Sequence, residues 1–100
     1  MANPITEYGY RHKHLAASGL VHTGSGILHT LTVNRPDTTA GAIITLYDGL
    51  TDAGTVIAII AMDAALFVIP ATLTYDVKLT TGLYIKFSAA VTADITVSYN

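Results

Sequence analysis

Apolar and polar residues alternate along most of this chain with a period of two. The clearest run, starting at residue 73, reads Leu-Thr-Tyr-Asp-Val-Lys-Leu, and the same alternation marks 27–34, 83–88 and 93–99. Successive side chains on a β-strand point to opposite faces, so each run predicts a strand with one buried face. The predicted core consists of Leu31, Val33, Leu46, Leu73, Tyr75, Val77, Leu83, Ile85, Phe87, Ile95, Val97 and Tyr99.

Turn residues separate these runs, and no helical pattern of useful length competes with them. We therefore expect eight or nine short strands, near 11–16, 19–22, 27–34, 41–47, 55–61, 66–69, 73–79, 83–88 and 93–99. Short strands at this spacing predict a single all-β domain, an antiparallel β-sandwich of jelly-roll or immunoglobulin-like type. The pattern leaves both topologies open.

Two of the predicted strands, 41–47 and 55–61, are apolar on both faces. An antiparallel strand of that kind is covered on both faces, and in a two-layer domain the second cover is most simply another subunit. The chain is therefore expected to self-associate. The residues expected at that contact are Ile43, Tyr47, Ile57 and Ile59, of which Ile57 and Ile59 are expected on one side of their strand.

The composition supports a buried surface. Charged residues are 12% of the chain and hydrophobic residues 51%, against roughly 25% charged in typical proteins. The net charge of −2 offers no attraction for nucleic acid or anionic lipid. The apolar window 55–73 contains Asp63 and Pro70, which favour two strands with a turn at 62–65 over a membrane-spanning helix. Neither nucleic acid nor a membrane is expected as a partner.

The first ten residues show no alternation and are expected to form an extended arm, 1–10, ahead of a sandwich domain, 11–100. They lack the apolar segment of a signal peptide. Tyr8 and Tyr10 could anchor the arm on a neighbouring protein, because tyrosine combines a large apolar ring with a polar tip. The basic run Arg11, His12, Lys13 and His14 could join that contact. The alternative is a frayed terminus.

Candidate chemical sites are few. His12 and His14 share one face of a strand, but a metal site needs a third ligand and the flanking cations disfavour a dication. His29 is expected on the same face as Ile27, Leu31 and Val33, as a hydrogen-bonded core or interface histidine, and His22 is expected at a loop edge.

The pair Asp48 and Asp52 suits a hairpin turn better than a calcium loop, whose ligand spacing differs. The sequence has no cysteine, and no serine, histidine and acid can be placed together. We expect a protein without catalytic activity, metal or cofactor.

Four runs within residues 20–99 are informative: GSGILHTLTVN (24–34), ITLYDG (44–49), TLTYDVKLTTGLYIKFS (72–88) and ADITVSY (93–99). They resemble small β-sandwich virion proteins of tailed bacteriophages. The resemblance implies a capsid decoration, or cement, protein that is made in the host cytoplasm and binds the capsid exterior. It also implies a homotrimer bound to the major capsid protein or another virion protein. A tail, neck or fibre module is the alternative, and a carbohydrate-binding sandwich is a further one.

Overall fold

The computed structural model describes residues 10–35, 41–62, 71–88 and 93–100. Within these residues the chain forms eight strands and no helix. The strands are β1 (Arg11–Leu15), β2 (Gly19–Thr23), β3 (Gly26–Arg35), β4 (Ile43–Asp48), β5 (Thr55–Ala61), β6 (Ala71–Leu79), β7 (Gly82–Phe87) and β8 (Asp94–Tyr99). The predicted all-β sandwich is confirmed. The strand expected at 66–69 and the turn at 62–65 lie wholly or mostly outside the described residues.

The strands form two four-stranded antiparallel sheets, β1-β8-β3-β6 and β2-β7-β4-β5. The pairs β4–β5, β3–β6, β2–β7 and β1–β8 are nested one outside the next. The chain therefore behaves as one long hairpin, turned between β4 and β5 and rolled over both sheets. This is the strand order of a jelly roll and not of an immunoglobulin fold, which decides between the two topologies that the sequence left open.

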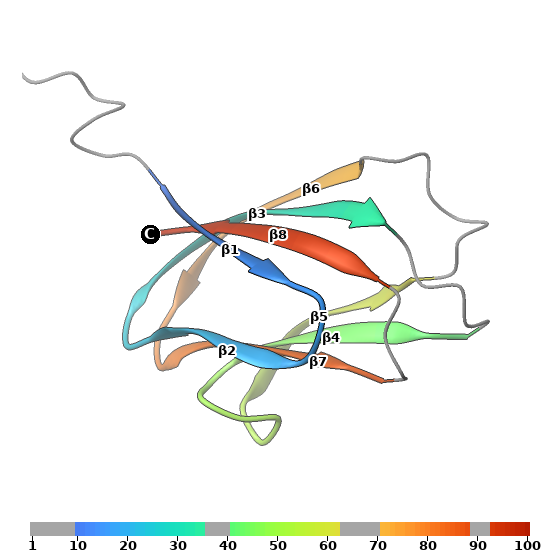
Figure 1. Cartoon of the computed structure of the whole chain (residues 1–100). Helices are drawn as coiled ribbons and strands as arrows, with labels where there is room; N and C mark the ends of the chain where they lie inside the picture. Colours follow the sequence, from blue (N-terminus) through green and yellow to red (C-terminus); the bar gives the residue numbers. More distant parts are fainter. Residues whose placement is uncertain (1–9, 36–40, 63–70, 89–92) are drawn as a thin grey trace, which may run out of the picture.

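The two sheets face each other and enclose the core between them (Figure 1). The predicted core residues that are buried are Leu31, Val33, Leu46, Leu83, Ile85, Phe87, Ile95 and Val97. The other four, Leu73, Tyr75, Val77 and Tyr99, are partly buried and pack against that core. Leu15, Val21, Leu28, Ile44, Ile60, Met62 and Leu79 join it from both sheets.

The prediction for the first half of β3 is wrong. Ile27 and His29 were expected on the face of Leu31 and Val33, but Leu28 is fully buried and Ile27 is 42% exposed. The pairing of β3 shifts between Leu28 and Thr30 against both of its neighbours. Such a bulge inserts an extra residue and reverses the faces of all the residues before it. His29 therefore lies half-buried beside the bulge and outside the core.

Candidate interaction surface

The outer side of the β2-β7-β4-β5 sheet is apolar. In β4, Ile44 and Leu46 point into the core, so Ile43, Thr45 and Tyr47 point outwards. Their neighbours across the sheet extend this surface through cross-strand pairs such as Tyr47 with Tyr84. We call it the apolar face, and it consists of Leu20, Ile43, Tyr47, Val56, Ile59, Ala61 and Tyr84.

Exposure on the apolar face is highest along β5. The side chains of Ile59 and Val56 are 63% and 49% exposed, while Ile43 and Leu20 are 37% and 39% exposed. Thr45, which pairs with Ile59 on one side and Lys86 on the other, is only 8% exposed. Exposed apolar residues gathered on one face of a sheet make this surface a candidate for contact with another protein.

Lys86 is the one charged side chain that the described strands place among these residues, and it is already paired. Its Nζ lies 2.9 Å from Oδ2 of Asp52 in the β4–β5 turn. The hydrogen bond and the attraction between the charges lower the pKa of Asp52 and raise that of Lys86. The apolar face therefore presents no net charge to a partner.

Of the four predicted contact residues of strands β4 and β5, Ile43, Tyr47 and Ile59 lie on the apolar face. Ile57 does not, because a bulge in the β4–β5 pairing falls at this residue. It is half-buried and packs against the core, while Val56 turns outwards. The expectation that Ile57 and Ile59 share one side is therefore wrong. Sequence reasoning also did not include Leu20, Val56 and Tyr84 in the contact.

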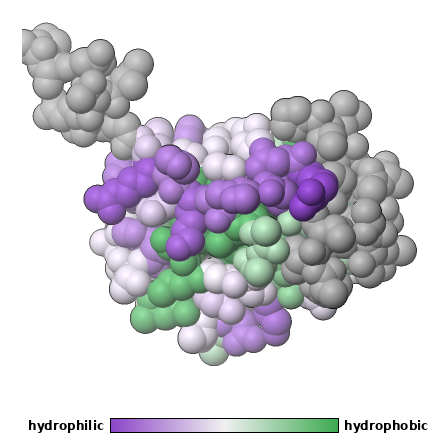
Figure 2. Space-filling view, viewed as in Figure 1, coloured by the Kyte–Doolittle hydropathy of each residue, from purple (hydrophilic) through white to green (hydrophobic). Residues whose placement is uncertain are grey.

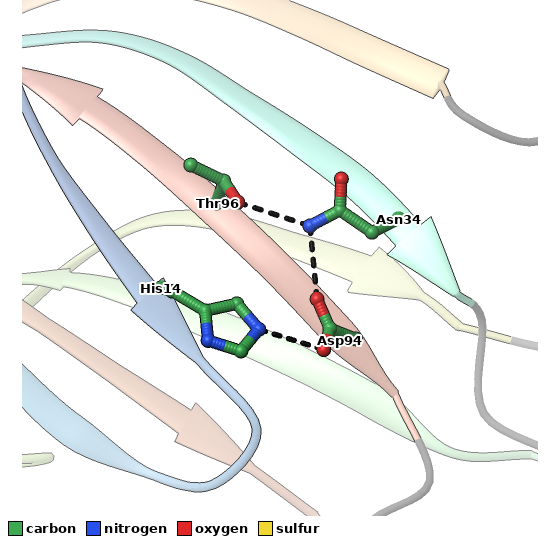
Figure 3. A network of polar contacts seen from close by, with 4 residues as sticks. All are labelled: His14, Asn34, Asp94 and Thr96. Carbon is green, nitrogen blue, oxygen red and sulfur yellow. Dashed lines mark hydrogen bonds and ion pairs between the residues drawn. The ribbon is translucent and has the colours of Figure 1, made fainter.

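The outer side of the β1-β8-β3-β6 sheet is polar, and we call it the polar face. Figure 3 shows a network near one end of this face, in which Asp94 of β8 bridges β1 and β3. The Asp94 carboxylate lies 2.6 Å from the His14 ring, and Asn34 donates to it at 2.9 Å and to Thr96 at 3.0 Å. The hydrogen bonds from His14 and then Asn34 lower the pKa of Asp94.

Hydroxyl groups fill much of the remaining polar face. They stand in register on three adjacent strands: Thr72 and Thr74 on β6, Thr30 and Thr32 on β3, and Thr96 and Ser98 on β8. Thr32 and Thr72 are hydrogen-bonded at 3.1 Å. In the space-filling view, hydrophilic residues form a band across the upper part of the molecule, and hydrophobic patches lie below it together with a smaller hydrophilic one (Figure 2). The two outer faces of the sandwich thus differ in chemistry.

Tyr10 is held against the polar face. Its ring stacks on that of His29, with centroids 4.1 Å apart and planes 9° from parallel. His29 is in turn hydrogen-bonded to Asp76 of β6. Tyr10 remains 47% exposed, so its other side is open to contact. Tyr8, the other predicted anchor, lies outside the described residues.

The predicted basic run forms β1, and all four of its side chains are exposed. Its register against β8 divides the run between two sides of the strand. Arg11 and Lys13 pair with core-side residues of β8, whereas His12 and His14 pair with Ser98 and Thr96 of the polar face. The basic run is therefore divided into two pairs, Arg11 with Lys13 and His12 with His14, which lie on opposite sides of one edge strand.

The two aspartates of the β4–β5 region serve the turns. The Asp48 carboxylate accepts backbone N–H groups of Thr80 at 2.9 Å, Thr81 at 2.8 Å and Gly82 at 3.3 Å. These hydrogen bonds, that from Thr81 foremost, lower the pKa of Asp48. Asp48 thus ties the β4–β5 turn to the β6–β7 turn.

The last predicted histidine, His22, makes a local hydrogen bond, and no metal site is found among the described residues. His22 donates from Nε2 to the carbonyl oxygen of Ser25 at 2.9 Å, at the end of β2. Among the residues that the structure describes, no three His, Cys, Asp or Glu side chains come together in a group that could hold a metal ion.

Comparison with protein-family models, curated proteins and solved structures found no match to this chain. Over the ranges that the structure describes, no helix has the length and hydrophobicity to cross a membrane.

Proposed function

We propose that this chain is a non-enzymatic structural protein of a tailed-phage virion, most simply a capsid decoration protein. It binds the outside of the shell, bridges neighbouring capsid subunits and associates with copies of itself. Its partners are then protein surfaces: its own, and that of the major capsid protein.

The observation that carries the proposal is the apolar face. Ile59, Val56, Ile43 and Leu20 are exposed on one side of a sheet that carries a single, already paired, lysine. Contact with another protein removes this surface from water, which is favourable by about 25 cal/mol for each Å² of apolar area. A chain with so little charge has few other means of keeping that surface soluble.

The fold and the sequence resemblance add support of a weaker kind. Jelly rolls recur in viral capsid proteins, although a fold alone does not determine a function. The resemblance of residues 20–99 to small phage virion proteins points to the same class.

A decoration protein of this kind acts by linkage. Whatever binds only the assembled shell stabilises it by mass action, in proportion to its affinity and concentration. Each copy needs to contribute little, because many identical attachments act together on one particle.

The test uses particles purified from the phage that encodes the chain. Mass spectrometry of the particles and electron cryo-microscopy should find the chain in many copies on the capsid exterior. Particles made without the gene should release their DNA at a lower temperature, and adding the purified chain should restore their stability. A position in the tail, neck or fibre would support the alternative module, and absence from the particles would overturn the proposal.

A further inference from the structure

We propose that β5 pairs, antiparallel and edge to edge, with β5 of a second copy of this chain. The two β2-β7-β4-β5 sheets would then join into one continuous sheet. This inference rests on the proposed self-association and names the element that performs it.

The described sheets have four edge strands, and three of them carry features that discourage pairing. An edge strand exposes unpaired N–H and C=O groups, and proteins protect such edges with charges, bulges or short strands. The edge strand β1 contains Arg11 and Lys13, and β6 contains Asp76 and Lys78. The edge strand β2 has five residues and is broken by a bulge after Leu20.

Among the described residues, the fourth edge, β5, carries the least of this protection. Its seven residues, Thr-Val-Ile-Ala-Ile-Ile-Ala, include no charged residue and no proline. It has a bulge at Ile57, but residues 58–61 pair regularly with 43–46 of β4. Ile59, in the middle of that regular part, is the most exposed large hydrophobic residue described. An exposed apolar edge of this kind is a template for another strand.

The occupant that fits β5 best is β5 itself. Antiparallel pairing about Ile59 sets Ile59 against its own copy and Ala58 against Ile60, so apolar residues meet in the regular part of the strand. A twofold axis perpendicular to the sheet also makes the two apolar faces continuous. Because Asp52 neutralises Lys86 within each copy, no like charges are brought together on this surface. A charged partner strand would find no counter-charge here.

Disulfide trapping tests the geometry. In an antiparallel pair, opposite Cα atoms lie about 4.5–5.5 Å apart, within the range that a disulfide spans. The chain has no cysteine of its own, so single substitutions are unambiguous. Under mild oxidation Ile59→Cys should form a covalent dimer, whereas Leu20→Cys, on the same face but at the opposite edge, should not. Cross-linking of Leu20→Cys alone, or of neither variant, would overturn edge pairing.

A charge test measures the energy of the contact by sedimentation. Ile59→Lys places two ammonium groups opposite each other and should raise the dissociation constant of the dimer by more than about 100-fold. The matched control is Ile27→Lys, an exposed isoleucine of the other sheet, which should leave it unchanged. Circular dichroism of both variants checks the fold.

The number of copies in the oligomer distinguishes β5 pairing, which gives a dimer, from the family resemblance, which implies a trimer. A twofold contact builds dimers, so a wild-type trimer or monomer in solution would overturn β5 pairing. Neither result would remove the chain from the virion, which the analysis of purified particles decides separately.

Discussion

At the scale of single residues, Asp48 connects two turns that are distant in the sequence. Its carboxylate accepts three backbone N–H groups, from Thr80, Thr81 and Gly82. Asp48 acts on the turn as an N-cap residue acts on a helix, because its short acidic side chain accepts hydrogen bonds from amides that lack partners in the secondary structure.

Replacing Asp48 with Ala should therefore lower the free energy of unfolding by about 1–2 kcal/mol, the cost of losing a comparable cap. The effect should depend on pH. Because the folded pKa of Asp48 lies below the unfolded value, its contribution is complete above about pH 4 and disappears as the pH falls through the folded value. Urea unfolding at pH 6 and pH 3 measures this: the gap between wild type and Asp48→Ala should narrow at pH 3. A gap of constant size would assign the loss to packing instead.

Asp76 is the second residue with a defined local role. It has a φ of 49°, in the left-handed region, within a bulge of β6 opposite His29. Asn and Asp tolerate this conformation better than other residues with a Cβ atom.

Asp76→Ala should destabilise the domain by about 1 kcal/mol or more, because Ala is strained there and the bond to His29 is lost. Asp76→Asn should cost less, since it keeps both the backbone tolerance and an oxygen that can accept from His29. Thermal unfolding of the two variants compares them. Equal losses would show that the charge, and not the backbone, determines the effect.

At the scale of elements, the alternation of residues predicts which faces of the strands are buried. It follows that a large residue of the core should contribute much more to the free energy of unfolding than a similar residue of an outer face. Ile85 of β7 is fully buried and Ile27 of β3 is 42% exposed.

Ile85→Ala should lower the free energy of unfolding by about 2–5 kcal/mol, through lost burial and the cavity that remains. Ile27→Ala should change it by less than about 0.5 kcal/mol. Chemical denaturation followed by far-ultraviolet circular dichroism measures both values. Similar losses in the two variants would contradict the assignment of inner and outer faces.

The errors of the sequence-based prediction also belong to this scale. The alternation of apolar and polar residues predicted the strands and most of their inner faces, because a strand that is buried on one side has an apolar residue at every second position. The bulges at His29 and Ile57 left no comparable signal, since one inserted residue looks like ordinary alternation in the other phase. His29 and Ile57 were therefore placed on the wrong faces.

The order of the strands in the sheets could not be predicted from the alternation either. Alternation reports the face of each strand but not its neighbour, so jelly-roll and immunoglobulin topologies looked alike. The network of His14, Asn34 and Asp94 joins three strands that are remote in sequence, which no local pattern reveals. On the apolar face, Ile43 and Ile59 were found because their strands are doubly apolar. Leu20 was missed because a short strand with one outward apolar residue has no such pattern.

At the scale of the whole molecule, the sandwich has two outer faces of opposite chemistry. One presents hydroxyl, imidazole and carboxylate groups, several of them hydrogen-bonded to one another, and the other presents aliphatic and tyrosine side chains. Tyr10, the last residue of the predicted arm, stacks on His29 at the polar face.

Deletion of residues 1–9 tests the role of that segment. The deletion keeps Tyr10, its stacking on His29 and all of β1, so the melting temperature should change by less than about 3 °C. Binding to purified shells should be markedly weaker if the arm contributes to attachment, as Tyr8 and its neighbours suggest. Unchanged binding would assign attachment to the sandwich alone.

The rolled hairpin also determines how the protein bears load. Because Arg11 at the start of β1 pairs with Tyr99 at the end of β8, the chain enters and leaves the fold side by side. Tension applied between these two points would break the β1–β8 hydrogen bonds one after another, as in opening a zipper, at low force. Tension transmitted along β5 would load the bonds of its sheet together, in shear, and meet much greater resistance. In the proposed role on a pressurised shell, copies joined through their sheets would reinforce it better than copies tethered at their ends.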